Sequence, residues 1–174
     1  MDSGIVVTGT KSLFHGLADR PDTVETLQLM SRSLRGMNLG RLGMAMCMLK
    51  VRKDSATVSS AAMPPVLLYR ASDRSVEEIE MAGYPLGLAV SPEYGIRQMA
   101  LTSGDALLLM TDGLPERQNR AGEPFGYDRC RTSFQEAGEL SPGEICATMA
   151  RLGGEWAEGS SQEDDVTLVA LKMK

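Results

Sequence analysis

Apolar and polar residues alternate along the chain with two different periods. Helical spacing, with an apolar residue every three or four positions, covers residues 4–18 and 22–36, and again residues 127–137 and 142–156. The intervening and final parts have the pattern of strands, which are short apolar or alternating stretches bounded by turn-forming residues. The predicted strands are residues 44–51, 56–61, 66–69, 76–81, 96–101, 106–110 and 166–173.

The connections between the predicted strands indicate the fold class. Most are too short for a crossover helix, so we expect neighbouring strands to be antiparallel. Helices on both sides of a run of strands are typical of an α+β layered sandwich rather than of a doubly wound parallel sheet. No repeat, low-complexity segment or long linker divides the chain. Residues 1–174 are therefore predicted to form a single domain.

Composition and charge exclude several classes of function. A net charge of −5 gives the chain no electrostatic attraction to nucleic acid or to an anionic membrane. No apolar run approaches the roughly 20 residues that cross a bilayer, and no signal-peptide pattern is present. The three cysteines stand at unrelated spacings, which favours a reducing cytoplasm over a disulfide framework or a zinc site. The single histidine, His15, argues against a histidine metal site or a Ser-His-Asp triad.

The stretch from Gly104 to Gly113 changes polarity within one residue. An apolar run from Ala106 to Met110, predicted to be a buried strand, is followed directly by Thr111-Asp112-Gly113. A carboxylate followed by glycine at the end of a buried strand can present an oxygen ligand to a hard cation. The alternative is an ordinary turn in which the aspartate bonds its own backbone.

A second acidic group, Glu163-Asp164-Asp165, comes just before the last predicted strand. If that strand lies beside residues 106–110, these carboxylates and Asp112 converge at one edge. Carboxylates this close repel one another and raise one another's pKa unless a cation lies among them. Mg²⁺ or Mn²⁺ is the divalent ion that such oxygen ligands favour. The alternative for residues 163–165 is a solvated acidic loop.

Several motifs together resemble a known family. The first group of motifs comprises Leu101-Thr102-Ser103-Gly104-Asp105, residues 107–116, Gly122-Glu123 and Phe125-Gly126. It is similar to the C-terminal half of the PPM (type 2C-like) metal-dependent serine/threonine phosphatases, in their bacterial stage II sporulation protein E branch. The other matching motifs are Ala61-Ala62-Met63-Pro64-Pro65, Gly83-Tyr84-Pro85-Leu86-Gly87 and Asp164-Asp165-Val166-Thr167. The order and spacing of these motifs extend the resemblance over essentially the whole chain.

The resemblance implies an α-β-β-α sandwich with a binuclear Mn²⁺ or Mg²⁺ centre, whose bound water hydrolyses phosphoserine or phosphothreonine. Asp112 and Asp164 match metal ligands of the family, and Asp165 matches a supporting or partial ligand. Gly113 is expected to permit the turn and Thr167 to form hydrogen bonds near the site. No catalytic residue beyond the metal ligands is implied. The implied partners are a phosphorylated protein substrate and an upstream sensor or regulatory domain, as in the control of sigma factors.

The chain departs from the family at one point. The Gly-Asp-x-x-Gly-His-Gly motif, which carries the bridging aspartate, is absent, and Asp2-Ser3-Gly4 is a poor substitute because it lies at a predicted helix start. Without that motif and its strands we expect an incomplete metal site, weak metal binding and exposed sheet edges that favour homodimerisation. Two interpretations stay open: part of a larger phosphatase, or a catalytically silent phosphatase-like interaction module.

Overall fold

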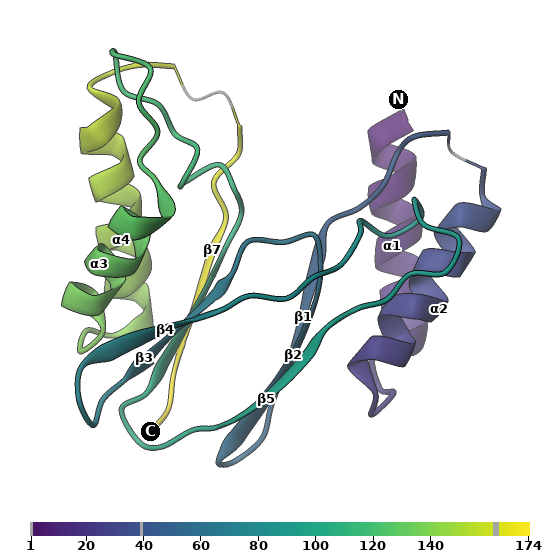
Figure 1. Cartoon of the computed structure of the whole chain (residues 1–174), viewed down its shortest axis with the longest axis horizontal. Helices are drawn as coiled ribbons and strands as arrows, with labels where there is room; N and C mark the ends of the chain where they lie inside the picture. The colour runs from purple at the N-terminus through teal and green to yellow at the C-terminus, as the bar shows by residue number, and fades with distance from the viewer. Residues whose placement is uncertain (1, 39, 162–163) are drawn as a thin grey trace. The chain divides into compact units, whose positions relative to one another are not determined.

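The computed structural model describes residues 2–38, 40–161 and 164–174. The chain divides into two compact units (Figure 1). Unit 1 comprises Met1–Met63 and Met81–Ala100, and unit 2 comprises Pro64–Glu80 and Leu101–Lys174. Each unit has its own antiparallel sheet and its own pair of helices.

Unit 1 contains two helices and a three-stranded sheet. Helix α1 (Asp2–Leu17) packs on α2 (Thr23–Gly36), and α2 contacts the sheet formed by β1 (Met46–Val51), β2 (Ser55–Ala61) and β5 (Ile96–Ala100), in the order β1-β2-β5. Helix α2 begins where predicted because the Asp22 carboxylate accepts the backbone N–H groups of Val24 and Glu25. Its apolar side chains at helical spacing, Leu27, Met30 and Leu34, are buried against the sheet.

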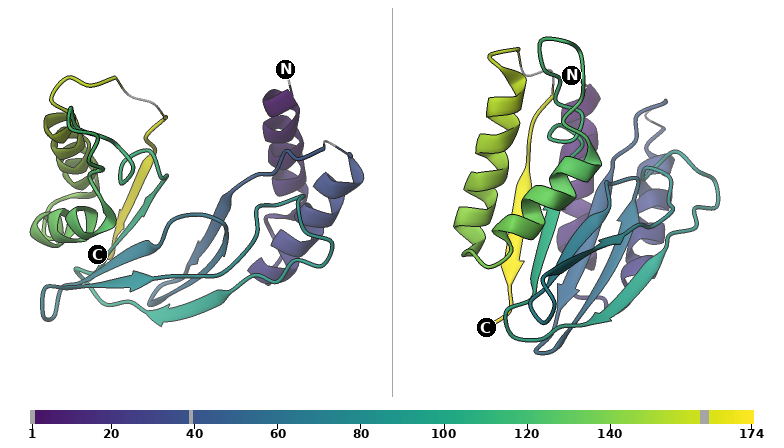
Figure 2. Two further views of the ribbon diagram at one scale, coloured as in Figure 1. Left: turned by 45° about the horizontal axis from the view of Figure 1, so that its top comes forward. Right: turned by 60° about the vertical axis from the view of Figure 1, so that its left-hand side comes forward.

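Unit 2 contains the remaining four strands and two helices. Its sheet has the order β4-β3-β6-β7, formed by β3 (Val66–Arg70), β4 (Ser75–Ile79), β6 (Ala106–Met110) and β7 (Leu168–Lys172), and all pairs are antiparallel. Helices α3 (Tyr127–Ala137) and α4 (Pro142–Ala157) cover one face of this sheet (Figure 2). A complete capping box starts α4, since Ser141 and Glu144 bond each other's backbone N–H groups.

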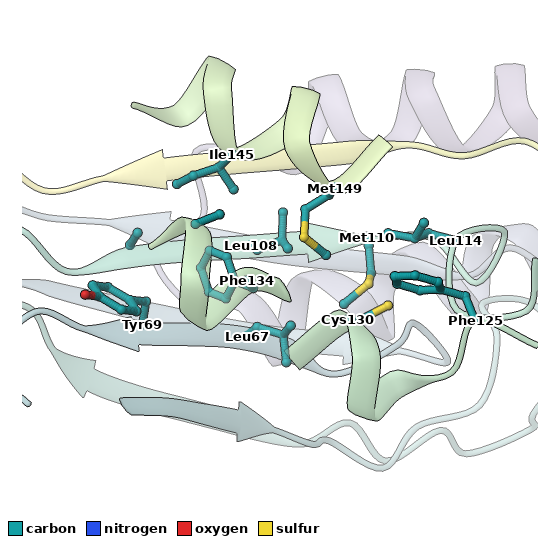
Figure 3. Close-up of a cluster of buried hydrophobic side chains, with 12 residues drawn as sticks. Leu67, Tyr69, Leu108, Met110, Leu114, Phe125, Cys130, Phe134, Ile145 and Met149 are labelled. Atoms are coloured by element: carbon teal, nitrogen blue, oxygen red, sulfur yellow. The ribbon is translucent and has the colours of Figure 1, made fainter. Parts of the chain in front are cut away.

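The core of unit 2 lies between these helices and the sheet (Figure 3). Leu108 of β6 is fully buried at its centre, beside Phe134 of α3 and Met149 of α4. The ring of Phe134 meets that of Tyr69 nearly edge to face, at 6.3 Å between centroids. Helix α3 ends at Gly138 against the same Tyr69 ring, where a Cβ atom would lie 2.2 Å from the tyrosine. A larger residue there would separate helix and sheet.

The α+β class with mainly antiparallel strands is confirmed. Two predicted strands start two residues later than expected, each for a structural reason. The first begins at Met46 because Met44 pairs instead with Leu86 as an isolated bridge. The last begins at Leu168 because the Thr167 N–H bonds the Thr111 hydroxyl rather than a backbone carbonyl.

The prediction that residues 1–174 form a single domain stays a prediction. Helix α1 does begin at Asp2, so Asp2-Ser3-Gly4 is helical, as expected. None of the helices in the described ranges combines the length and apolar character that a bilayer crossing requires.

Candidate metal site

Strands β6 and β7 are direct neighbours. Their register runs from Ala106 opposite Lys172 to Met110 opposite Leu168. Because the pair is antiparallel, the end of β6 adjoins the start of β7. Two segments that are far apart in sequence, residues 111–113 and 164–167, therefore meet at one edge of the sheet. The predicted metal site required these segments to lie side by side.

Thr111 holds the two segments together just beyond the ladder. Its backbone N–H donates to the Thr167 carbonyl at 3.1 Å. Its hydroxyl accepts the Thr167 N–H at 2.9 Å and donates to the Asp165 carbonyl at 3.1 Å. Sequence reasoning did not single out Thr111, although its place between the buried strand and Asp112 was a usable signal. Thr167 contributes here through its backbone, and the predicted role of its side chain stays a prediction.

Gly113 is buried and leaves no room for a side chain. A Cβ atom added there would lie 2.4 Å from the Asp165 carbonyl oxygen and 3.3 Å from that of Asp164. Only glycine lets the turn after β6 approach the backbone before β7 this closely. The requirement is therefore steric and concerns the spacing of the two acidic segments.

The carboxylates that were expected to bind metal occupy this edge. Asp112, Asp164 and Asp165 are all exposed. The Asp112 carbonyl accepts the Glu116 N–H at 2.9 Å, which closes the turn after β6, and the Asp164 carboxylate accepts the Asp165 N–H at 2.8 Å. Glu163 lies outside the described residues. Within the part of the chain that the structure describes, no group of three or more acidic, histidine or cysteine side chains is close enough to hold a metal ion.

A closed hairpin loop, residues 117–125, borders this edge. The Asn119 side chain accepts the N–H groups of Ala121 and Glu123 at 2.9 and 3.0 Å, and the Asn119 N–H donates to the Glu123 carbonyl. The Phe125 N–H closes the base of the loop on the Arg117 carbonyl at 2.8 Å. The loop is thus held in shape by its own hydrogen bonds.

A hollow of about 510 Å³ lies between this loop and the segment before β7. Its walls include Arg117 and Arg120 on the loop and Ser160 and Asp164 on the other side. The phenol of Tyr127, at the start of α3, has a raised pKa because it is partly buried and because Glu116 and Asp112 carry negative charge nearby.

The family follows from a comparison of sequences. Residues 1–174 match the profile of the family described as Stage II sporulation protein E (SpoIIE). The chain belongs to this family. A search of curated proteins found no significant match.

Solved structures agree with the family in fold. The chain is similar to the SiaA-PP2C domain of Pseudomonas aeruginosa, with a TM-score of 0.83 and 17% identity over 99% of this chain and 69% of that one. The structure of the RsbU and RsbW domains of Rv1364c from Mycobacterium tuberculosis gives a TM-score of 0.77 and 25% identity, over 98% of this chain and 47% of that one. The manganese-presoaked phosphatase domain of SpoIIE from Bacillus subtilis gives a TM-score of 0.60 and 18% identity, over 95% of this chain and 73% of that one.

These comparisons confirm the PPM-type assignment, its stage II sporulation protein E branch and the α+β fold. The chain is a phosphatase-type domain by family. It spans about two thirds of the SiaA domain and less than half of the Rv1364c chain.

Proposed function

We propose that this chain supplies one side of the metal-dependent site of a phosphoserine/phosphothreonine phosphatase. The observation that carries the proposal is the junction of β6 and β7. Thr111 bonds Thr167 and Asp165, and Gly113 packs on the Asp165 backbone, so Asp112 and Asp164 are presented from adjacent, rigidly spaced segments. An ordinary surface turn would need neither contact.

The oxygen donors at this edge suit Mn²⁺ or Mg²⁺, which prefer carboxylate, carbonyl and water ligands. Asp112 and Asp164 would be the ligands and Asp165 a supporting or partial ligand, while Gly113 and Thr167 keep the two segments in register. When bound, such ions supply a water of lowered pKa and positive charge for the phosphoryl oxygens. The manganese-presoaked SpoIIE domain and RsbX in complex with magnesium support this choice of ion. In the family the centre is binuclear; here the described residues provide only part of the ligand set.

The substrate in this proposal is a phosphorylated protein of a bacterial signalling pathway, under the control of a sensor or regulatory domain. Two similar structures support this arrangement. One chain combines an RsbU and an RsbW domain, and another joins a PP2C domain to a fragment of a regulatory domain. Cys47, Cys130 and Cys146 are all free thiols, which supports a cytoplasmic location. A homodimer stays among the proposed assemblies, because edge strands can pair with a second copy of a chain.

The test measures Mn²⁺-dependent hydrolysis of a phosphoserine peptide by the full-length gene product. Asp112→Asn and Asp164→Asn should each lower the rate at least about 100-fold, because even residues that only orient metal ligands contribute 10–100-fold. Asp54→Asn, in the exposed turn between β1 and β2, is the matched control and should leave the rate unchanged. Full activity of both site variants would refute the proposed roles.

A catalytically silent phosphatase-like interaction module is the second candidate. It is favoured by the absence of any three-residue metal-binding group among the described residues. Calorimetry separates the two. A silent module binds the phosphopeptide without hydrolysing it and shows no heat of Mn²⁺ binding, whereas the phosphatase binds the ion and loses that binding in Asp112→Asn.

A further inference from the structure

A second concave surface lies on the helical side of unit 2, between α3 and α4. It is a groove of about 550 Å³. Its apolar floor is formed by Phe125, Leu152 and Trp156. Asn119, on the hairpin loop of residues 117–125, lines both this groove and the hollow beside the candidate metal site. A molecule bound in the groove would therefore touch the loop that borders that site.

The indole of Trp156 is fixed in the floor of the groove by three contacts. Its Nε1–H donates to the Glu123 carbonyl at 3.0 Å. The Phe125 ring meets it nearly edge to face, at 6.2 Å between centroids. The Arg129 guanidinium lies 4.0 Å from the ring centroid and is held by the Phe125 carbonyl at 2.9 Å. The ring is nevertheless only half-buried, so the part of it that Arg129 does not cover is an apolar surface reached from solvent.

The rim of the groove is acidic. The lining residues Asp128, Glu136, Glu155 and Glu158 are acidic, and Arg129 is basic. Arg151 binds the Glu155 carboxylate at 2.7 Å and Arg131 lies 3.7 Å from that of Asp128, so among the described residues Glu136 and Glu158 are the rim carboxylates that no cation pairs. Glu136, Glu155 and Glu158 stand near the C-terminal ends of α3 and α4, and neither helix has a basic residue in its last turn. Carboxylates at helix C-termini face the negative end of the helix dipole, which is unfavourable. A cationic ligand would relieve this unfavourable arrangement.

We propose that this groove is the docking site for a basic amphipathic segment of a partner protein. Its apolar side chains would cover Trp156 and Leu152, and its lysine or arginine side chains would meet the carboxylates on the rim. The groove and its charge complementarity do not depend on the metal site, so the proposal stands apart from the proposed activity. The carboxylates attract the segment, and the exposed part of the indole supplies the apolar contact area.

Trp156 is the only tryptophan of the chain, so its fluorescence reports directly on the groove. The probe is a short amphipathic peptide of lysine, leucine and alanine, and the control peptide carries glutamate in place of lysine. We expect a saturable change in Trp156 emission with the basic peptide alone, weakening as salt rises. Saturable binding of the acidic peptide, or no saturable change with the basic one, would overturn the proposal.

Paired variants separate docking from general attraction to an acidic protein. Glu136→Gln with Glu158→Gln should weaken binding roughly fivefold, the effect of losing two exposed charge contacts. Glu80→Gln with Glu93→Gln removes the same charge from exposed positions outside the groove and should change affinity by less than about twofold. Equal losses in both pairs would contradict the proposal. A thermal melt of each variant establishes that it is folded.

Discussion

Replacing Gly113 with alanine tests the spacing of the two acidic segments directly. The added Cβ would lie 2.4 Å from the Asp165 carbonyl oxygen. Carbon–oxygen contacts in proteins are usually no shorter than about 3.3 Å, so the segments must separate by about 0.9 Å. The opposing atom is backbone and cannot rotate away. Overpacking of this kind costs about 1–3 kcal/mol, and each kcal/mol lowers Tm by roughly 2–4 °C in a chain of this length.

The same displacement should weaken metal binding, because the residues pushed apart, Gly113 and Asp165, directly follow the proposed ligands Asp112 and Asp164. Thermal unfolding by circular dichroism gives Tm, and calorimetric titration with Mn²⁺ gives the affinity. Gly154→Ala is the matched control, since a Cβ at this position of α4 meets nothing within 4 Å. Alanine is about 1 kcal/mol better than glycine inside a helix, so the control should melt higher than the wild type and bind Mn²⁺ equally well.

A Gly113→Ala protein that melts no lower than the wild type and binds Mn²⁺ with the same affinity would show that the segments can separate at no cost. In that case the close approach of residues 113 and 165 would not hold the two acidic segments at a fixed distance. A lower Tm with unchanged Mn²⁺ affinity would confirm the steric conflict and exclude its link to the ligands.

Two further predictions concern buried groups away from the site. Burial by itself would raise the pKa of the Asp105 carboxyl. The hydrogen bonds from the N–H groups of Ala71 and Thr102, together with the Arg70 guanidinium at 3.1 Å, outweigh burial, so the pKa of this carboxyl is lowered. Its stabilising effect is complete above the ordinary pKa of about 3.9 and is lost as pH falls through the lower folded value. Asp105→Asn should therefore lower the free energy of unfolding by about 3 kcal/mol at pH 7 and make urea unfolding less dependent on pH below 4. An unchanged pH profile would contradict this. Burial raises the pKa of the Cys130 thiol to about 12. Iodoacetamide at pH 8 should therefore leave Cys130 unlabelled, as judged by peptide mass spectrometry, until denaturant is added. Rapid labelling of the folded chain would disprove this.

The helices, the strands and the class of the protein could be predicted from local patterns in the sequence. Helical spacing predicted helices over residues 22–36 and 142–156, and the structure has α2 and α4 there, capped by Asp22 and Ser141. This was possible because periodicity and capping depend on residues within a few positions of one another. The motif containing Asp112 and the family assignment likewise rest on short stretches and their order.

Which segments lie next to one another became visible only in the folded chain. No local pattern states that β3 pairs with both β4 and β6, or that β6 ends beside the start of β7, because strand pairing joins residues far apart in sequence. That pairing gives Thr111 its three hydrogen bonds and makes Gly113 indispensable for steric reasons. The groove at Trp156 is also a product of packing, since its walls come from two helices and a loop that acquire a common surface only in the folded chain.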